Sequence, residues 1–226
     1  MTAKRTSPSR ESSAHPPGRP PLVIGLIGGV GCGKSTLADA IYERRYQQRQ
    51  DTLIVDGDTV GHEIRDLPHV QEQVVAAFGD DVIGDDGLID RQVLGTRVFG
   101  GGQQDPDSVR RGLDTLNGIM HPAMRAEFVD RIETTAAPVV LFDAAILLEA
   151  GWDDLCDEIV MLDVTDANRL ARVSERGWTE EQWRLREASQ MPLDGKAQAA
   201  TIAVDANGDP DDAAAALLEL LQESGS

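Results

Sequence analysis

Short apolar runs alternate with stretches of helical periodicity along the chain from residue 21 onward. Each run lacks a polar face, as expected of strands that helices cover on both sides. The apolar runs span residues 22–27, 52–55, 139–142, 158–164 and 201–204. The helical stretches span residues 35–47, 70–78, 108–119, 123–134, 179–190 and 210–221. This alternation predicts an α/β fold in three layers, with a five-stranded parallel sheet between helices.

Local signals mark the first residues of two of these helices. Thr179 and Gln182 have the spacing of a capping box, in which each side chain accepts a backbone N–H from the other residue. Asp209 followed by Pro210 is the usual combination of an N-cap and a first helical residue. Both helices are therefore predicted to begin at these positions.

Residues 1–21 differ in composition from the rest of the chain. They are rich in proline, serine and arginine and nearly free of large apolar side chains, so they cannot bury enough surface to order themselves. We predict a disordered tail over residues 1–21 and one folded domain over residues 22–226.

The charge balance narrows the classes of partner. The formal net charge is −18, and because residues 1–21 carry a net +3, the remainder carries −21. An acidic body repels nucleic acid, which disfavours it as a partner. No apolar run approaches the roughly 18 residues that a membrane span needs. The two cysteines have no metal-ligand spacing and favour a reducing, cytoplasmic location.

A glycine-rich segment after the first apolar run carries the strongest chemical signal. Gly28-x4-Gly33-Lys34-Ser35 matches the P-loop pattern, between a predicted strand and a predicted helix. Its backbone N–H groups and the helix N-terminus would hold the phosphates of ATP. Lys34 supplies a positive charge for those phosphates, and the Ser35 hydroxyl is a ligand for Mg²⁺. The predicted ATP contacts are Gly29, Val30, Gly31, Cys32, Gly33, Lys34, Ser35 and Thr36.

A P-loop alone leaves several functions open. The Asn-Lys-x-Asp motif of a GTPase is absent from the sequence, and the short chain with a single P-loop favours a small-molecule kinase. The acceptor could be a nucleoside, a nucleotide or a sugar acid, and a nucleotide-binding module without catalysis is a further alternative. Cys32 also has two interpretations: a passive loop residue, or a thiol made reactive by Lys34 and the helix N-terminus.

Acidic residues follow two of the predicted strands. Asp56 and Asp58 come after the strand at 52–55, and a period of two would place them on one side of the crevice. Asp143 ends the strand at 139–142, where P-loop enzymes carry an acid near Mg²⁺. Arg172 and Arg176 are four residues apart, so they would share a helix face and could neutralise phosphate charge during transfer.

Seven segments in order resemble the dephospho-coenzyme A kinase family. They are IGLIGGVGCGKST (24–36), VDGD (55–58), DGLIDRQVLGTRVF (86–99), LNGIMHPAMR (116–125), ILLEAG (146–151), RLARVSERG (169–177) and DANG (205–208). The resemblance implies phosphorylation of the 3′-hydroxyl of dephospho-coenzyme A by ATP with Mg²⁺. The sequence departs from the family pattern at Ala145, where a proline is usual. Glu149 occupies the position of the glutamate in that pattern.

The resemblance also assigns roles to individual residues. Asp58 matches the catalytic aspartate and would accept the proton of the attacking hydroxyl. Lys34, Arg172 and Arg176 would neutralise charge around the phosphates. The acceptor would contact Asp58, Arg91, His121, Arg125 and Glu149, and adenine would lie near Asn207 and Gly208. The metal ligands would be Ser35 and Asp143. An acceptor-binding insertion is predicted over about residues 61–137 and a mobile lid over about 165–190 of this P-loop kinase fold.

Overall fold

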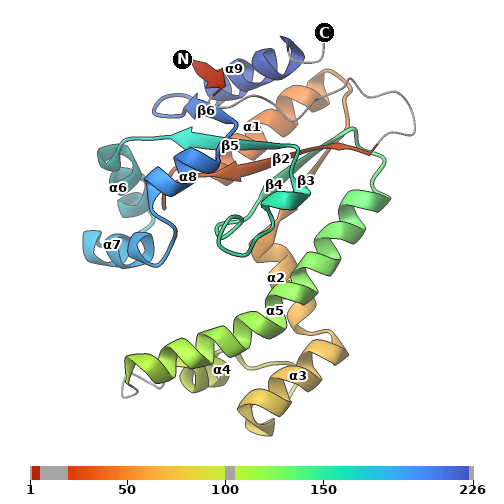
Figure 1. Cartoon of the computed structure of the whole chain (residues 1–226), viewed down its shortest axis with the longest axis vertical. Helices are drawn as coiled ribbons and strands as arrows, with labels where there is room; N and C mark the ends of the chain where they lie inside the picture. Colours follow the sequence, from red (N-terminus) through yellow and green to blue (C-terminus); the bar gives the residue numbers. More distant parts are fainter. Residues whose placement is uncertain (1, 6–19, 100–104, 224–226) are drawn as a thin grey trace. The chain divides into compact units, whose positions relative to one another are not determined.

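A mostly parallel sheet of six strands organises the chain. The computed structural model describes residues 2–5, 20–99 and 105–223, and two compact units divide the chain into residues 1–56 with 131–226 and residues 57–130. The sheet belongs to the first unit, with strand order β1-β6-β5-β2-β4-β3 (Figure 1). The strands are β1 (Ala3–Arg5), β2 (Leu22–Ile27), β3 (Thr52–Asp56), β4 (Val139–Asp143), β5 (Glu158–Asp163) and β6 (Ile202–Asp205).

The strand register places the carboxyl ends of the central strands beside one another. The five strands from β2 to β6 run parallel, so their carboxyl ends meet at one edge of the sheet. Asp143 at the end of β4 is in register with Leu26 on one side and with Asp56 on the other. The glycine-rich segment that follows β2 therefore begins beside Asp143.

Two helices cover one face of the sheet. The helix α1 (Lys34–Gln47) and the C-terminal helix α9 (Pro210–Glu223) pack against each other and against the strands. Leu37, Ile41 and Leu217 from these helices join inward-facing strand residues such as Leu26 and Leu162 in one buried cluster. Close packing of this cluster fixes where α1 begins, and with it the loop that precedes α1.

Three shorter helices of the same unit follow β5. They are α6 (Asp166–Glu175), α7 (Glu180–Ala188) and α8 (Leu193–Ala199). The predicted capping box is confirmed at α7, where Thr179 and Gln182 bond each other's backbone N–H groups at 3.2 and 2.9 Å. Asp209 also behaves as predicted, because its carboxylate accepts the N–H of Asp211 at 2.9 Å in the first turn of α9.

The second unit, residues 57–130, is helical. It contains α2 (Gly57–Arg65), α3 (Pro68–Phe78), a short 3₁₀ turn η1 (Asp80–Val82), α4 (Arg91–Phe99) and most of α5 (Pro106–Thr134). Asp90 caps α4 by accepting N–H groups from Gln92 and Val93 at 2.8 and 3.1 Å. The unit overlaps the predicted insertion at 61–137.

One long helix replaces two predicted helices in this unit. The predicted stretches 108–119 and 123–134 form a single α5, with Pro122 inside it. His121 is therefore helical although it precedes proline, a position where the helical region is disfavoured. Proline removes one backbone hydrogen bond, but the flanking turns retain their packing, including Met124 against Gly61 and the buried Phe128.

The first residues of the chain also differ from the prediction. Ala3–Arg5 forms β1, which pairs antiparallel with β6, so the sheet has six strands and the fully disordered tail is wrong for these residues. Backbone bonding to β6 and contact with α9 supply the stabilisation that composition does not predict. Removal of residues 1–21 is therefore expected to lower stability, because β6 would lose its partner strand β1; residues 6–19 lie outside the described residues.

No helix within the described residues has both the length and the apolar character needed to cross a membrane.

Candidate active site

The P-loop adopts a conformation that requires glycine. Gly31 and Gly33 have φ angles of 84° and 92°, in the left-handed region that side chains rarely adopt. A Cβ at Gly31 would also lie 2.8 Å from the carbonyl oxygen of Arg169, and one at Gly29 would meet the guanidinium of the same residue. The loop therefore passes close to α6, and α1 begins at Lys34.

A hydroxyl and a carboxylate meet next to this loop. Ser35 Oγ donates a hydrogen bond of 2.5 Å to Asp143 Oδ2, and Asp143 is only 5% exposed. The first turn of α1 carries Ser35, while the end of β4 carries Asp143. Oxygen donors of this kind suit Mg²⁺, which takes few protein ligands and completes its shell with water and phosphate oxygens. The two predicted metal ligands are therefore adjacent.

A hollow of about 310 Å³ lies beside the second half of the P-loop. Arg172 reaches across it from α6 and donates hydrogen bonds of 2.7 Å to the carbonyl oxygens of Cys32 and Ala206. Arg176 lines the same hollow but is the C-cap of α6, which ends at Glu175, so the two arginines do not share a helix face as predicted. The lining residues are Cys32, Gly33, Thr36, Leu37, Arg172, Glu175, Arg176, Ala206, Gly208, Pro210 and Ala213.

The side chain of Asn207, a predicted adenine contact, is hydrogen-bonded within the protein. Its side chain bonds the Asp205 carboxylate at 2.8 Å and the Asn168 amide at 3.0 Å, and it accepts the Thr165 N–H at 2.9 Å. The backbone N–H of Asn207, at 3.0 Å, and then its side-chain amide donate to the Asp205 carboxylate and hold the pKa of Asp205 below its ordinary value. Asn207 thus fixes the segment that presents Gly208 to the hollow, and its side chain is already engaged.

Cys32 is a buried residue of the loop. Its side chain is 1% exposed and lies against Gly28, where a Cβ would come within 2.6 Å of the sulfur. Reagents reach a thiol only where solvent does, so the reactive-thiol interpretation is not supported. The passive interpretation, in which the backbone of Cys32 shapes the loop, agrees with this burial.

Three side chains that sequence reasoning missed hold Val30, in the first half of the loop. Glu187 accepts the Val30 N–H at 2.8 Å, and Trp183 donates to the Val30 carbonyl at 3.0 Å. Arg169 donates to the same carbonyl at 3.3 Å and to Glu187 at 2.6 Å. Burial opposes the charge of Arg169, but hydrogen bonds to Asp166 and Glu187 outweigh it and raise the pKa of Arg169.

Glu149 is engaged within the first unit. Its carboxylate accepts the backbone N–H of Met191 at 2.7 Å and lies 3.6 Å from Lys196 Nζ. These contacts fix the Glu149 side chain in the segment that follows β4. They support a structural role for Glu149 in addition to the predicted contact with the acceptor.

The other predicted acceptor residues belong to the second unit. Asp58 lies in the first turn of α2, because the chain turns into a helix at Gly57; the strand periodicity assumed for Asp56 and Asp58 is therefore wrong. Arg91 is the first residue of α4. His121 and Arg125 are one turn apart on α5. Burial lowers the pKa of His121, which keeps its imidazole neutral at neutral pH.

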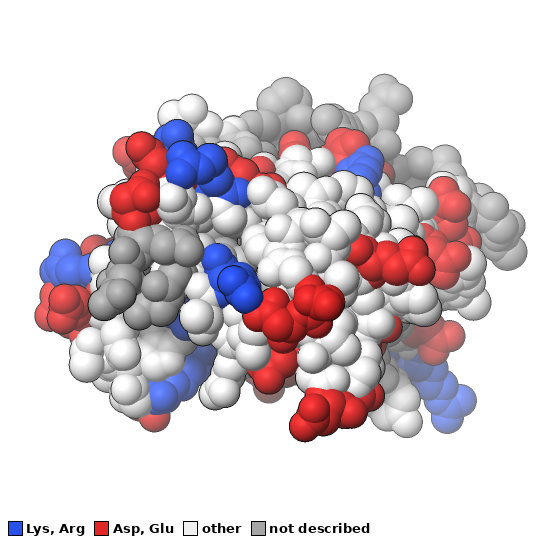
Figure 2. Space-filling view, turned by 90° about the horizontal axis from the view of Figure 1, so that it is seen from below, with Lys and Arg blue, Asp and Glu red and all other residues white. Residues whose placement is uncertain are grey.

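The charged surface is mixed on the face drawn in Figure 2. Acidic side chains form separate patches among wide uncharged areas, with basic groups between them. An anionic ligand must therefore find its positive charge locally, as the P-loop and Arg172 provide.

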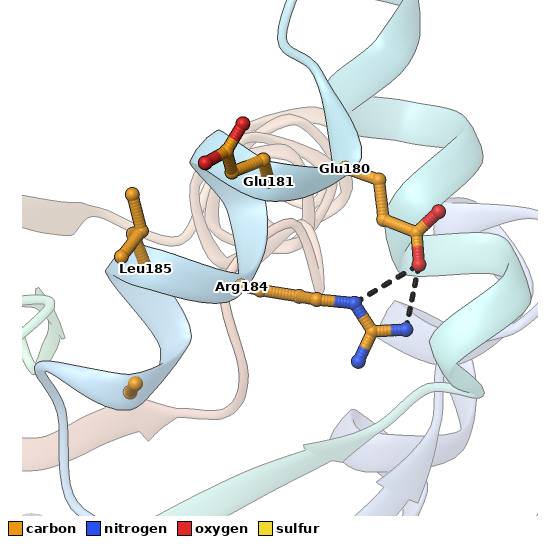
Figure 3. Close-up of a pocket in the computed structure, with 5 residues that line it drawn as sticks. Glu180, Glu181, Arg184 and Leu185 are labelled. Carbon is orange, nitrogen blue, oxygen red and sulfur yellow. Dashed lines mark hydrogen bonds and ion pairs between the residues drawn. The ribbon is translucent and has the colours of Figure 1, made fainter.

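A second hollow lies on the outer side of α7 and has no connection with this chemistry. Figure 3 shows Glu180, Glu181, Arg184 and Leu185 on successive turns of that helix. Arg184 is tied to Glu180 at 2.6 Å, and Leu185 is 67% exposed. All the lining residues of this hollow come from one helix. The hollow therefore lacks the convergent polar groups of a ligand site.

Known proteins resemble this chain over most of its length. A family model for dephospho-CoA kinase matches residues 22–212. The chain is 37% identical over 208 residues to a dephospho-CoA kinase of Corynebacterium glutamicum, covering 89% of this chain and 96% of that protein. It is 33% identical over 195 residues to one from Geobacter sulfurreducens, covering 84% and 92%.

Solved structures with a similar fold cover most of the chain. TT1252 from Thermus thermophilus has a TM-score of 0.71 at 28% identity, covering 91% of this chain and 98% of that one. A dephospho-CoA kinase from Campylobacter jejuni has a TM-score of 0.60 at 18% identity, covering 89% and 96%, which is a likeness of fold.

Proposed function

The chain belongs to the dephospho-coenzyme A kinase family, and from that premise we propose which of its residues carry the reaction. The enzyme uses ATP to phosphorylate dephospho-coenzyme A at its 3′-hydroxyl, which gives coenzyme A. The observation that carries the proposal is the contact between Ser35 and Asp143 beside the P-loop. The alternatives with another acceptor or with no catalysis lose their support, because the relatives are dephospho-coenzyme A kinases over most of the chain.

ATP phosphates are proposed to bind at the P-loop. Backbone N–H groups from Gly33 to Thr36 at the N-terminus of α1 present a positive potential to an anion, whereas the N–H of Val30 is bonded to Glu187. Lys34 adds a charge at the first residue of that helix. Arg172 and Arg176 line the adjoining hollow and neutralise the charge that develops on the transferred group. Gly208 contacts the nucleoside end of ATP in the same hollow.

Ser35 and Asp143 are the residues that would hold Mg²⁺. When bound there, the ion would supply positive charge that stabilises the negative charge of the transferred group. A group of three or more His, Cys, Asp or Glu side chains suited to a metal is absent from the described part of the chain. A site with one carboxylate and one hydroxyl therefore fits an ion whose remaining ligands would be water and the phosphates of the nucleotide.

Asp58 is proposed to orient the 3′-hydroxyl and accept its proton. It follows Asp56 by two residues, and Asp56 is in register with Asp143 across β3 and β4. Two residues span at most about 7 Å, so chain connectivity keeps Asp58 near the strand ends that carry the phosphate machinery. Arg91, His121 and Arg125 are proposed to contact the acceptor.

A cytoplasmic location is part of the same proposal. Cys32 and Cys156 are both buried thiols outside any disulfide, as expected of a protein kept in a reducing compartment.

Transfer is proposed to be direct, from ATP to the acceptor oxygen. Without dephospho-coenzyme A, the enzyme should therefore exchange no label between ADP and ATP, because no phosphorylated enzyme forms. The measurement is incubation of the protein with ATP and ¹⁴C-labelled ADP, followed by separation of the nucleotides. Exchange at a rate comparable to turnover would contradict direct transfer.

A further inference from the structure

A buried lysine lies behind the P-loop and has no role in the chemistry described above. Lys196 belongs to α8 and is only 2% exposed. Its Nζ donates hydrogen bonds to the Gly28 carbonyl at 3.2 Å and to Gln190 Oε1 at 2.8 Å. The same atom lies 3.6 Å from the Glu149 carboxylate. An ammonium group has three donors, and three acceptors surround this one.

The surroundings of Lys196 are built for a cation. Burial lowers the pKa of Lys196, the Glu149 and Glu187 carboxylates oppose that shift, and the positive charge of Lys34 adds to it. A charge buried at this cost persists where its partners are well placed. Truncating the lysine would leave the Gly28 carbonyl, the Gln190 amide and Glu149 without this donor, and unsatisfied buried groups are costly.

The contacts of Lys196 join the first P-loop residue to the end of the α7 segment. Gly28 is the first residue of the P-loop, and Gln190 is the second residue after the end of α7. On the neighbouring residue Val30, Glu187, Trp183 and Arg169 hold both polar backbone groups. The first half of the loop is thus bonded to residues of the α6–α8 segment, while its second half faces the hollow.

We propose that Lys196 is a positioning residue for ATP, which holds the Gly28 carbonyl so that the P-loop keeps the shape that binds phosphate. The inference rests on the proposed ATP site at this loop. Lys196 acts through the loop and touches no substrate. Preorganisation of this kind lowers the cost of binding, because the nucleotide does not have to order the loop.

The test compares Lys196→Met with Lys196→Gln and with a matched control. Lys4→Met is the control, since Lys4 is exposed on β1 and undergoes the same chemical change. For each protein, the Kd for ATP is measured by direct binding without acceptor, together with KM for both substrates, kcat and the melting temperature.

Lys196→Met should weaken ATP binding about 10- to 100-fold, the effect of losing hydrogen bonds from a charged group. The KM for dephospho-coenzyme A should change less than the Kd for ATP, because Lys196 bonds the Gly28 carbonyl directly at 3.2 Å but lies 3.6 Å from Glu149, a predicted acceptor contact. Lys196→Gln keeps an N–H donor and should fall between Lys196→Met and wild type in ATP affinity. Lys4→Met should match wild type in every measurement.

A Kd for ATP within twofold of wild type in Lys196→Met would overturn the proposal. If that variant is too unstable to measure, the folded Lys196→Gln decides: unchanged ATP affinity with a lowered melting temperature would show a purely structural lysine. Failure of the proposed function looks different, because wild-type protein would then bind ATP without turning over dephospho-coenzyme A.

Discussion

Replacing Asp58 with asparagine is expected to lower turnover of dephospho-coenzyme A by about 10²- to 10⁴-fold while leaving ATP binding intact. Asparagine keeps the size of the side chain and can still accept a hydrogen bond, but it cannot take up the proton of the attacking hydroxyl. The P-loop and its partners belong to other elements, so the phosphate contacts stay unchanged. Steady-state kcat and a separate Kd for ATP distinguish the two effects.

The chain offers a matched control for this variant. Glu63→Gln neutralises an exposed carboxylate on the same helix, α2, and should leave kcat unchanged. Turnover of Asp58→Asn within about threefold of wild type would remove this residue from the mechanism, because loss of a general base costs far more.

Replacing Asp143 with asparagine should have a comparable effect through the metal. The amide oxygen can still accept the Ser35 hydroxyl, so the fold should persist, but the charge that holds Mg²⁺ is lost. Metal-assisted charge stabilisation contributes several kcal/mol, which corresponds to a loss of about 10²-fold or more in kcat. A titration with Mg²⁺ should also show half-maximal activity at a higher free concentration than in wild type.

Asp154→Asn serves as the control for this titration, because that residue is exposed in the segment after β4. A variant Asp143→Asn with the wild-type Mg²⁺ dependence would show that the ion is held elsewhere.

Local patterns in the sequence were sufficient to predict the P-loop, Asp143 and two helix caps. The P-loop motif placed the phosphate cradle, since glycines, lysine and serine have fixed places in it. Asp143 could be predicted because strand ends in a parallel sheet converge on one edge, and Ser35 indeed meets it at 2.5 Å. Capping at Thr179 and Asp209 followed from hydrogen bonds within a few residues.

The residues that hold the P-loop from behind could not be predicted in this way. Val30 and Glu187 are separated by 157 positions, and Gly28 and Lys196 by 168. Neither Glu187 nor Lys196 differs in sequence from an ordinary exposed residue of a helix. Only the packing of α6, α7 and α8 beside the sheet brings them to the loop.

Tertiary packing also decided two elements against local rules. Pro122 was expected to separate two helices, but α5 continues through it. Residues 3–5 have a composition typical of disorder, and an available sheet edge at β6 orders them as β1. In both cases, contacts with distant residues outweigh a local preference.

The acceptor preference tests the central claim most directly. Purified enzyme is incubated with MgATP and, separately, with dephospho-coenzyme A, adenosine, CMP or gluconate, and the phosphorylated products are identified. Dephospho-coenzyme A should be converted to coenzyme A, with the new phosphate on the 3′-hydroxyl, and the other three should give little turnover. Efficient phosphorylation of one of those three, with none of dephospho-coenzyme A, would contradict the assignment.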